Sequence, residues 1–474
     1  MDINEIYPNI LYNHLITSLA THSLKVKFGS VFFAILGYEQ DGHEFINNAI
    51  SNGALTIVLE NSSYIIQNIK VNFIVVQNVR KELAIVSKKF YQTSLSKKTL
   101  IAITGTNGKT SVSTLIFKYL RFLKINALLI GSNGLFYNEE GYETTNTTPD
   151  LLTIYQMIEC YHEKLQYVII EISSQAIREL RVLGLDFNLV LVTNISQDHF
   201  DYHPNWEDYV FSKGILLIGR PDDESHHIIV NCESIYYRFF DNLTMLRLIS
   251  FGLNKGDYHA NIIKENLDET IFYIITKEKD ILITTSLVGK FNVENILAFY
   301  SVIETLKISS NLVPSFVSQN PQISGRMERY RILNRRIIID YAHTPEAVNH
   351  CLSFIRNETT NKLRVVIGCG GRRDRKKRPL MAENALKFSD KVYFTEDNSR
   401  GEPFDQIIND MLTNTQFKNY EIIPKREDAI IKALSESLQG EVIALVGMGN
   451  ERYQSSLGLV TDYDIIKRWE EQNG

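Results

Sequence analysis

The stretch IAITGTNGKTSVSTLIFKYL, residues 101–120, joins residue types that together bind phosphate. An apolar run predicts a strand, and a helical pattern begins directly at Lys109 and Thr110. Backbone N–H groups at a helix N-terminus attract an anion, the lysine adds positive charge, and the threonine hydroxyl suits Mg²⁺. The common nucleotide loop has four residues between its glycines, whereas only two separate Gly105 from Gly108. We interpret the segment as a short variant of a nucleotide-binding loop.

Other polar residues also follow predicted strands. Glu171 ends the strand YVIIE, and an acid beside a phosphate loop is a suitable Mg²⁺ ligand, although a solvated cap is the plain alternative. The string DHFDYH, residues 198–203, holds two histidines, but no third zinc ligand stands at a recognisable spacing. We therefore favour one histidine near magnesium and phosphate over a zinc site.

The basic run GRRDRKKRP, residues 371–379, is the most strongly charged stretch of the chain that follows a strand. A nuclear signal, a nucleic-acid-binding patch and a solvated loop are the alternatives. However, it comes directly after LRVVIGC, and α/β folds collect ligands at the carboxyl ends of their strands. We expect it to contribute to binding of an anionic substrate group.

Size and composition set wide limits. The 474 residues predict two to four domains, and the net charge of −5 gives no reason to expect nucleic acid or an anionic membrane as partner. The N-terminus has no secretory pattern, and no apolar stretch of about 18 residues predicts a membrane span. Cys160, Cys232, Cys351 and Cys369 lie far apart, so we expect reduced core thiols in a cytoplasmic protein.

Strand and helix patterns alternate along most of the chain and predict an α/β fold in three domains. ALLIGS, YVIIEIS and LVLVTNIS are apolar throughout, as in mostly parallel sheets buried on both faces. TIFYIITKEKDILITTSLVG predicts an antiparallel addition, and the last third alternates strands with helices such as TPEAVNHCLSFIRN, as in a Rossmann-like unit. We place a small α/β domain in residues 1–98, a central phosphate-loop domain in 99–328 and a Rossmann-like domain in 329–474.

Taken in order, these strings resemble the Mur ligases, the ATP-dependent amide-forming enzymes of peptidoglycan synthesis. The similarity is to the MurE type, which adds the third residue of the stem peptide, and it runs from about residue 20 to residue 455. The family loop is GTNGKT, so the short loop is complete. Further strings are NTTPD, EISSQAI, TNISQDHFDYH, GKFNVEN, SGRME, DYAHTPEA, GCGGRRDRKKRPLM, DNSR and GMGNERYQ.

The resemblance implies a reaction and the residues that perform it. A substrate carboxylate attacks the γ-phosphate of ATP, and an amine then displaces phosphate from the acyl phosphate. The implied ATP-binding residues are Gly105, Thr106, Asn107, Gly108, Lys109, Thr110, Ser111, Asn295, Arg326, Asp340 and His343. The implied magnesium ligands are Thr110, Glu171, His199 and Lys213, the last as a carbamate formed with CO₂ rather than a plain surface lysine. The catalytic set is Lys109, Glu171, His199, Lys213, Asn295, Arg326 and Asp340.

The resemblance also implies the substrates. The first domain would bind a UDP-sugar peptide and the last the incoming amino acid. Family members that add meso-diaminopimelate carry Asp-Asn-Pro-Arg, whose arginine pairs with the far carboxylate, and residues 397–400 here read DNSR. The implied substrate-binding residues are Ser23, Asn146, Thr147, Thr148, Ser173, Arg181, Arg373, Asn398, Arg400, Gly447 and Glu451.

Several positions depart from the family pattern, chiefly around the two substrates other than ATP. The first-domain Asp-Ser-Arg is His22-Ser23-Leu24, Glu179 and Gln175 replace the usual Gln and His, and Gly-Lys-Gly-His-Glu is GMGNE at 447–451. The sequence predicts a monomeric MurE-type ligase that joins meso-diaminopimelate to UDP-MurNAc-L-Ala-D-Glu with small-molecule partners only.

Two alternatives stay open. One is the same chemistry on another carboxylate, which the altered first-domain turn favours. The other is a catalytically silent nucleotide-binding paralogue, which the intact Lys109, Glu171, Lys213 and Asp340 disfavour.

Overall fold

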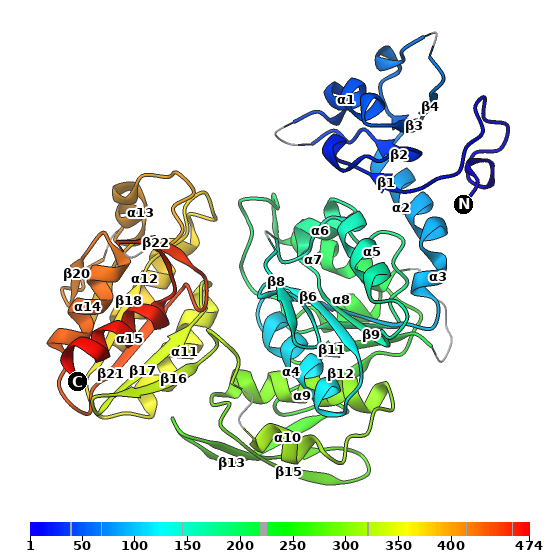
Figure 1. Ribbon diagram of the computed structural model, residues 1–474. Coiled ribbons are helices and arrows are strands. Elements are labelled where there is room, and N and C mark those ends of the chain that lie inside the picture. Colours follow the sequence, from blue (N-terminus) through cyan, green and yellow to red (C-terminus); the bar gives the residue numbers. More distant parts are fainter. Residues whose placement is uncertain are drawn as a thin grey trace. The chain divides into compact units, whose positions relative to one another are not determined.

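The computed structural model describes residues 1–37, 40–67, 69–144, 146–218, 225–319, 322–413, 415–456 and 458–474. Within these ranges the chain forms two compact units (Figure 1). The first unit holds residues 1–102 and 124–188, and the second holds residues 103–123 and 189–474. This division passes through the predicted central domain, and the predicted boundaries after residues 98 and 328 stay predictions.

The first unit opens with a parallel four-stranded sheet in the order β1-β2-β3-β4. Its short apolar strands pack against α1, with Phe32, Ile46 and Ile57 in the core. The segment HEFINNAISNGA forms η3 followed by α1, and Gly53 follows the end of α1 at a φ of +105°, a conformation that glycine adopts readily. The elements of this part are η1 Ile3–Glu5, β1 Leu19–Ala20, η2 Ser23–Lys25, β2 Ser30–Phe33, η3 Gly42–Phe45, α1 Ile46–Ser51, β3 Ala54–Leu59, η4 Ser62–Tyr64, β4 Asn72–Val75, α2 Val79–Phe90 and α3 Gln92–Leu95.

Residues 124–188 complete the first unit with strands in the order β9-β6-β7-β8. β6 and β9 run parallel, as their apolar runs predict, whereas β7 pairs antiparallel with both β6 and β8. The elements here are β6 Ala127–Gly131, β7 Gly134–Tyr137, β8 Glu140–Tyr142, α5 Leu151–Cys160, β9 Tyr167–Glu171 and α6 Ser174–Arg178. β5, Thr99–Thr104, carries the chain from the first unit into the phosphate loop of the second.

The second unit begins with the helix that follows the phosphate loop and continues with the parallel strands β10, β11 and β12. The predicted antiparallel addition is confirmed as β14 and β15, and a third strand, β13, pairs with β14. The elements are α4 Lys109–Phe122, β10 Leu189–Val192, α7 Trp206–Gly214, η5 Ile215–Leu217, β11 His227–Asn231, α8 Tyr237–Asp241, β12 Ile249–Phe251, β13 His259–Glu265, β14 Thr270–Ile275, β15 Asp280–Thr285, α9 Lys290–Thr305 and α10 Val313–Ser318.

The C-terminal part of the second unit has a six-stranded sheet in the order β16-β17-β21-β18-β19-β20. β16 is antiparallel to β17, and every other pair is parallel. Because the chain skips from β17 to β18 and returns with β21 between them, the carboxyl ends of these strands flank a switch point where such folds bind ligands. The elements are β16 Glu328–Ile332, β17 Arg335–Asp340, α11 Pro345–Asn357, β18 Leu363–Ile367, α12 Lys377–Phe388, β19 Lys391–Phe394, α13 Phe404–Met411, β20 Tyr420–Ile422, α14 Arg426–Glu436, β21 Val442–Val446, β22 Tyr453–Ser455, β23 Gly458–Val460 and α15 Asp462–Asn473.

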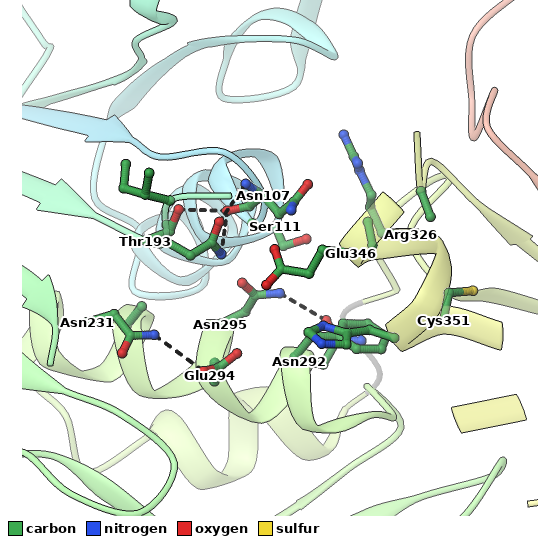
Figure 2. Close-up of a pocket in the computed structure, with 18 of the residues that line it drawn as sticks. Asn107, Ser111, Thr193, Asn231, Asn292, Glu294, Asn295, Arg326, Glu346 and Cys351 are labelled. Atoms are coloured by element: carbon green, nitrogen blue, oxygen red, sulfur yellow. Dashed lines mark hydrogen bonds between the residues drawn. The ribbon is translucent and has the colours of Figure 1, made fainter. Parts of the chain in front are cut away.

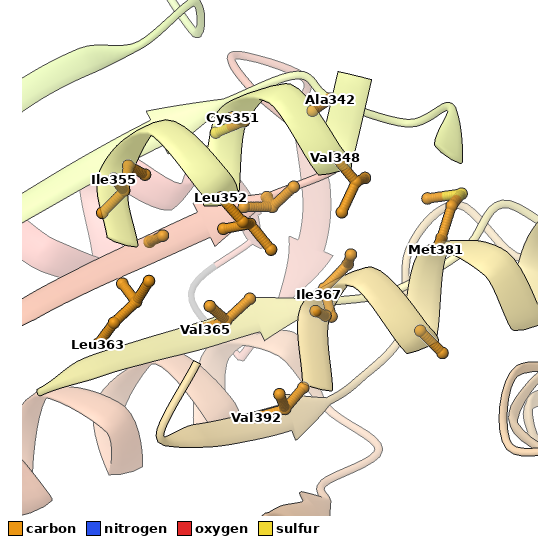
Figure 3. Close-up of a cluster of buried hydrophobic side chains, with 14 of the residues drawn as sticks. Ala342, Val348, Cys351, Leu352, Ile355, Leu363, Val365, Ile367, Met381 and Val392 are labelled. Atoms are coloured by element: carbon orange, nitrogen blue, oxygen red, sulfur yellow. The ribbon is translucent and has the colours of Figure 1, made fainter. Parts of the chain in front are cut away.

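A dense apolar core fixes this switch point. Leu352 and Ile355 of α11, Val365 of β18 and Met381 of α12 belong to one buried cluster (Figure 3). Helix α11 therefore packs against the sheet, and its first turn follows closely after Asp340, the last residue of β17. Close packing of this kind holds the strand ends in a fixed arrangement.

The basic run continues into a helix, because α12 begins at Lys377. One expectation from the sequence needs correction. The cysteines are not all core residues, because Cys160 is exposed and Cys232 is half-buried, whereas Cys351 and Cys369 are buried. Across the part of the chain that the structure describes, no helix is both long and apolar enough to cross a membrane.

Candidate active site

The phosphate loop is shaped by two glycines that no other residue could replace without movement. Gly105 and Gly108 have φ values of +137° and +85°. A Cβ would lie 2.0 Å from Thr193 Oγ1 at Gly105, and 2.5 Å from Asn295 Oδ1 at Gly108. The predicted helix α4 starts at Lys109, so the N–H groups of its first turn, which have no partner within the helix, border the loop. The side chains of Thr193, after β10, and Asn295, on α9, therefore pack directly against the loop glycines.

Residues after β10 hold the loop through a set of hydrogen bonds that the motif alone did not reveal. The Thr106 and Asn107 N–H groups donate to the backbone oxygen and the Oδ1 of Asn194, both at 2.8 Å. Thr193 Oγ1 donates to the Asn107 carbonyl at 2.6 Å (Figure 2). The hydroxyl oxygen Oη of Tyr209, on α7, lies 2.8 Å from Thr106 Oγ1. Thr193, Asn194 and Tyr209 were not predicted as site residues, although the first two lie in the string TNISQDHFDYH at a strand end.

Two lysines converge on the loop. Lys109 Nζ donates to the carbonyls of Gly105 and Thr106 at 3.0 and 2.8 Å. Lys213 Nζ, on α7, donates to the same Gly105 carbonyl at 2.9 Å and is only 1% exposed. Burial and the nearby Lys109 hold the pKa of Lys213 well below its usual range. Lys213 is therefore no surface lysine, and it belongs to the same polar cluster as the loop.

A buried acid, Asp198, connects the loop region to the basic run. It is 4% exposed. Its carboxylate oxygens lie 3.1 Å from Lys377 Nζ, 3.3 Å from His199 Nε2 and 3.6 Å from His343 Nε2. Burial would raise the pKa of Asp198, but His199, Lys377 and His343 together hold it well below the usual range. Burial lowers the pKa of His199 to about 3, which leaves a neutral imidazole at neutral pH beside an ionised carboxylate.

The second histidine of the DHFDYH string, His203, pairs with a different acid, Asp208. His203 Nδ1 lies 2.6 Å from Asp208 Oδ2. Within the described ranges, no group of three or more histidine, cysteine, aspartate and glutamate side chains is arranged to hold a metal ion.

Arg326 and Asp340 border the loop from the other side. Arg326 donates to Thr110 Oγ1 at 3.3 Å, and its guanidinium lies 4.2 Å from the centre of the Tyr341 ring. The Asp340 carboxylate accepts the N–H groups of Met327 and Ala342 at 2.7 and 2.8 Å. Burial raises the pKa of Asp340 in spite of Arg326 and these donors.

A pocket of about 390 Å³ extends from the loop between α9 and α11 (Figure 2). Asn295 Nδ2 donates to Asn292 Oδ1 at 3.2 Å at its floor. The residues that line the pocket include predicted ATP-binding residues and others that were not predicted: Asn107, Gly108, Ser111, Thr193, Asn194, Ile195, Asn231, Glu233, Ser234, Ile235, Phe251, Phe291, Asn292, Glu294, Asn295, Ala298, Arg326, Asp340, Tyr341, Ala342, Glu346, Ala347, His350 and Cys351.

The predicted amino-acid pocket lies at the switch point of the C-terminal sheet. Arg400 donates to the carbonyls of Asn398 and Gly371 at 3.2 and 3.4 Å, and a Cβ on Gly370 would lie 2.7 Å from its Nη1. A Cβ on Gly447 would lie 3.1 Å from Asp397 Oδ2. These predicted residues are thus brought together by the loops after β18, β19 and β21.

Two other predicted residues of this pocket make charged or polar contacts of their own. Arg373 donates to Asp201 Oδ2 at 3.3 Å, and Glu451 Oε1 accepts from Tyr341 Oη at 2.7 Å. The rest of the basic run is mostly paired within the protein, because Arg375 and the buried Arg378 bind Asp410, and Arg378 also binds Glu402. Only part of the run is left for an anionic substrate.

The first unit holds the remaining predicted residues. Glu171, 1% exposed at the end of β9, receives Ser132 Oγ at 3.1 Å on its side chain and Thr148 Oγ1 at 2.8 Å on its carbonyl. Thr147 Oγ1 lies 3.0 Å from Ser132 Oγ, and the Ser173 N–H donates to Thr148 Oγ1 at 3.1 Å. Asn146 directly precedes these threonines. These residues form one polar cluster at the carboxyl end of β9.

Arg181 and Glu179 form an ion pair beside that cluster. Arg181 Nη2 lies 2.5 Å from Glu179 Oε2, and its Nη1 donates to the Thr148 carbonyl at 2.9 Å. Arg181 thus offsets the negative charge that Glu179 introduces in place of glutamine. Ser23 lies in η2, the short helix between β1 and β2, where it is 4% exposed.

A loop of the phosphate-binding type, acids at strand ends and a C-terminal α/β sheet match the features expected of an ATP-dependent ligase with more than one α/β domain. Family models for the N-terminal catalytic region, the middle domain and the glutamate ligase domain of Mur ligases match residues 15–91, 103–303 and 325–449. The chain belongs to the Mur ligase family, whose members are ATP-dependent amide ligases.

Named relatives support this over nearly the whole chain. The chain is 34% identical over 461 residues to a UDP-N-acetylmuramoyl-L-alanyl-D-glutamate–2,6-diaminopimelate ligase of Geobacillus thermodenitrificans, covering 95% of this chain and 93% of that protein. It is 34% identical over 448 residues to UDP-N-acetylmuramyl-tripeptide synthetase 2 of Oceanobacillus iheyensis, covering 93% and 90%.

Solved structures agree on the fold. A 2,6-diaminopimelate ligase structure matches with a TM-score of 0.71 at 26% identity, over 100% of this chain and 99% of that one. A MurF ligase of Thermotoga maritima in complex with ADP matches with a TM-score of 0.68 at 16% identity, over 96% and 98%. The expected α/β class and family membership are confirmed.

Proposed function

We propose that this chain is a MurE-type ligase that joins meso-diaminopimelate to UDP-MurNAc-L-Ala-D-Glu with ATP. The observation that carries the proposal is the pairing of a complete phosphate loop, ringed by Lys109 and Arg326, with an arginine-bearing pocket at the switch point of the C-terminal sheet. The full-length similarity to ligases named for these substrates supports it.

The chemistry follows from where charge develops. The substrate carboxylate attacks the γ-phosphorus of ATP, the bond to the bridging oxygen of ADP breaks, and an acyl phosphate forms. The amine of the incoming amino acid then attacks the acyl carbon and loses a proton, and phosphate leaves as the amide forms. Lys109, the loop N–H groups and Arg326 stand where negative charge on phosphoryl oxygens needs to be stabilised.

Magnesium and a carbamate on Lys213 belong to the same proposal. Mg²⁺ keeps several waters and phosphate ligands and needs few protein side chains, and the Thr110 hydroxyl, the neutral His199 and Glu171 are suitable donors. When bound, the ion would neutralise phosphate charge. Carbamylation forms an N–C bond between the Lys213 amine and CO₂ with release of a proton. Burial of this amine beside Lys109 favours its neutral form, which is the form that attacks CO₂.

The substrate assignments are residue-specific proposals. Arg400 and Arg373 would hold the distal carboxylate of diaminopimelate, with Asn398, Gly447 and Glu451 around the amino group. The cluster of Asn146, Thr147, Thr148, Ser173 and Arg181, with Ser23, would hold the UDP-MurNAc-dipeptide. We also propose that the enzyme acts as a cytoplasmic monomer with domains near residues 1–98, 99–328 and 329–474.

The deciding experiment is a matrix of acceptors and amino acids. Purified protein with ATP and Mg²⁺ is offered UDP-MurNAc-L-Ala-D-Glu, or other carboxylates, with meso-diaminopimelate, lysine or no amine, and both ADP release and the amide product are measured. Product only with the UDP-MurNAc-dipeptide and diaminopimelate supports the proposal. Product with another carboxylate favours the first alternative, and no ADP release in any combination overturns the ligase assignment.

A further inference from the structure

Tyr341 directly follows β17, the strand that lies between β16 and β21 in the C-terminal sheet. Asp340, the last residue of β17, pairs with Val446, the last residue of β21. On the opposite side, the Met327 N–H, just before β16, donates to the Asp340 carboxylate at 2.7 Å. Tyr341 therefore stands between Arg326 and the loop that follows β21. It is half-buried and lines the pocket, so it is more than a core residue.

The ring of Tyr341 fixes the position of Arg326. The guanidinium lies 4.2 Å from the ring centre, which is a cation–π contact, while its Nη2 donates to Thr110 Oγ1 at 3.3 Å. The imidazole of His343 also packs against the ring, with the two ring centres 4.6 Å apart at 63°. A guanidinium that is already held by a ring loses less freedom when it binds a phosphate. The ring thus prepares Arg326 for a ligand at the phosphate loop.

The hydroxyl group of Tyr341 reaches the predicted amino-acid pocket. Its Oη donates to Glu451 Oε1 at 2.7 Å. Burial, and then the charge of Glu451, raise the pKa of Tyr341, so the hydroxyl stays a donor at neutral pH. A carboxylate with one oxygen fixed in this way keeps its second oxygen for an ammonium group. A Cβ on Gly449 would lie 2.9 Å from the Tyr341 Cβ, so the loop that carries Glu451 packs directly on this tyrosine.

We propose that Tyr341 is a positioning residue that couples the two ends of the reaction. Its ring fixes Arg326 at the transferring phosphoryl group, and its hydroxyl fixes Glu451, which receives the incoming amine. The inference rests on the proposed function, which places ATP at the loop and diaminopimelate at the switch point. The amine has to reach an acyl group formed beside the phosphate loop, so the two groups need a fixed mutual position. One rigid side chain that contacts both supplies it, because a misplacement of about 1 Å can lower a rate roughly 10²-fold.

Two substitutions separate the ring from the hydroxyl group. Tyr341→Phe keeps the ring and removes the donor to Glu451, so KM for diaminopimelate should rise roughly 5- to 20-fold while KM for ATP changes by less than about twofold. Tyr341→Leu removes both contacts, so KM for ATP should also rise, by roughly 3- to 30-fold. Tyr463→Phe is the matched control, because it removes a hydroxyl from a ring on α15 that stacks on Tyr330 outside the pocket lining.

Double mutants test whether each half of Tyr341 acts through its named partner. Glu451→Ala alone should raise KM for diaminopimelate, and Y341F/E451A should be no worse than E451A, because the hydroxyl then has no carboxylate to hold. In the same way, Y341L/R326A should bind ATP no more weakly than R326A. Calorimetric titration of the full chain with ATP and Mg²⁺, without acceptor or amine, measures the second cycle independently of turnover.

An unchanged KM for diaminopimelate in Y341F, equal rises in both KM values in Y341F, or additive effects in the double mutants would overturn the inference. Thermal unfolding of each variant separates these results from misfolding, and Y341F keeps the shape of the side chain. If the acceptor matrix shows that lysine is joined instead of diaminopimelate, the same measurements are made with lysine, so a wrong substrate and a wrong role for Tyr341 give different results. In a chain that forms no amide, equal ATP affinities of Y341L and Y341F would still overturn the inference.

Discussion

The predicted phosphate loop and the turn at residues 22–24, where a UDP group is proposed to bind, show how differently two proposed ligand-binding motifs of one chain are built. The loop is braced by Thr193, Asn194 and Tyr209, and its glycines admit no side chain. At the turn, His22 Nδ1 accepts from the Leu24 N–H at 3.2 Å and so serves the local backbone, while Leu24 is 81% exposed. A braced loop tolerates few changes, whereas an exposed turn can change partner without loss of fold.

The largest expected effect tests the braced region. Lys109→Ala removes the ammonium that lies against the loop carbonyls and would contact the transferring phosphoryl group. We expect amide formation to fall by at least roughly 10²-fold with little change in thermal unfolding, because such preorganised charge acts mainly on the transition state. Lys279→Ala, at an exposed turn between β14 and β15, is the matched control. Near-normal turnover in folded K109A would remove the loop from catalysis.

Substitutions of Lys213, on α7, test whether its buried amine carries the proposed anionic carbamate. Lys213→Ala should lose activity by roughly 10²-fold if its carbamate neutralises the metal and orients it. Lys213→Arg should be equally inactive, because a guanidinium keeps the positive charge and forms no carbamate. Short carboxylic acids should partly restore K213A by filling the anionic position. An active K213R, or a map of active, ATP-bound enzyme that shows a bare amine at Lys213, would contradict the carbamate.

The same contrast explains what the sequence could and could not predict. The loop, the strand before it and α4 follow from a local pattern, and helix α11 follows from its apolar spacing and a Thr344 cap. Thr193 and Tyr209 could not be assigned, because their role depends on which strand and helix pack beside the loop. The ion pairs of the basic run could not be predicted for the same reason, because its partners Glu402 and Asp410 are distant in sequence.

An intermediate effect is expected in the amino-acid pocket. Arg400→Ala removes a fixed guanidinium that would pair with the distal carboxylate of diaminopimelate. A charged hydrogen-bonded contact contributes about 1.5–3 kcal/mol, so KM for diaminopimelate should rise roughly 10- to 150-fold while KM for ATP stays unchanged. Relative use of lysine should increase, because lysine lacks that carboxylate. A wild type that prefers lysine would show that the pocket is misassigned.

A smaller effect is expected where Glu179 replaces glutamine. Glu179→Gln breaks the ion pair with Arg181 and removes a negative charge near the proposed diphosphate site. Because a like charge in a partly buried site weakens binding of an anion, affinity for UDP-MurNAc-L-Ala-D-Glu should increase by roughly three- to tenfold. Calorimetric titration measures it, with ATP affinity as the internal control. Weaker binding in E179Q would mean that the pair holds the Thr148 loop in place and that its charge is not felt by the ligand.

The smallest effect addresses the turn itself. Leu24→Arg returns an arginine to the position where family members carry one, and because Leu24 is 81% exposed the substitution should not disturb the core. An exposed charge contributes up to about 1 kcal/mol, so affinity for the UDP-MurNAc-dipeptide should rise by at most roughly fivefold and should lose that gain at high salt. Leu11→Arg, at a site 80% exposed in the same unit, adds the same charge elsewhere and is the matched control. A gain in L24R alone indicates that the UDP group lies at this turn. Equal affinities in all three proteins, with weak binding throughout, would instead favour an acceptor that carries no UDP, for which an arginine here has nothing to bind.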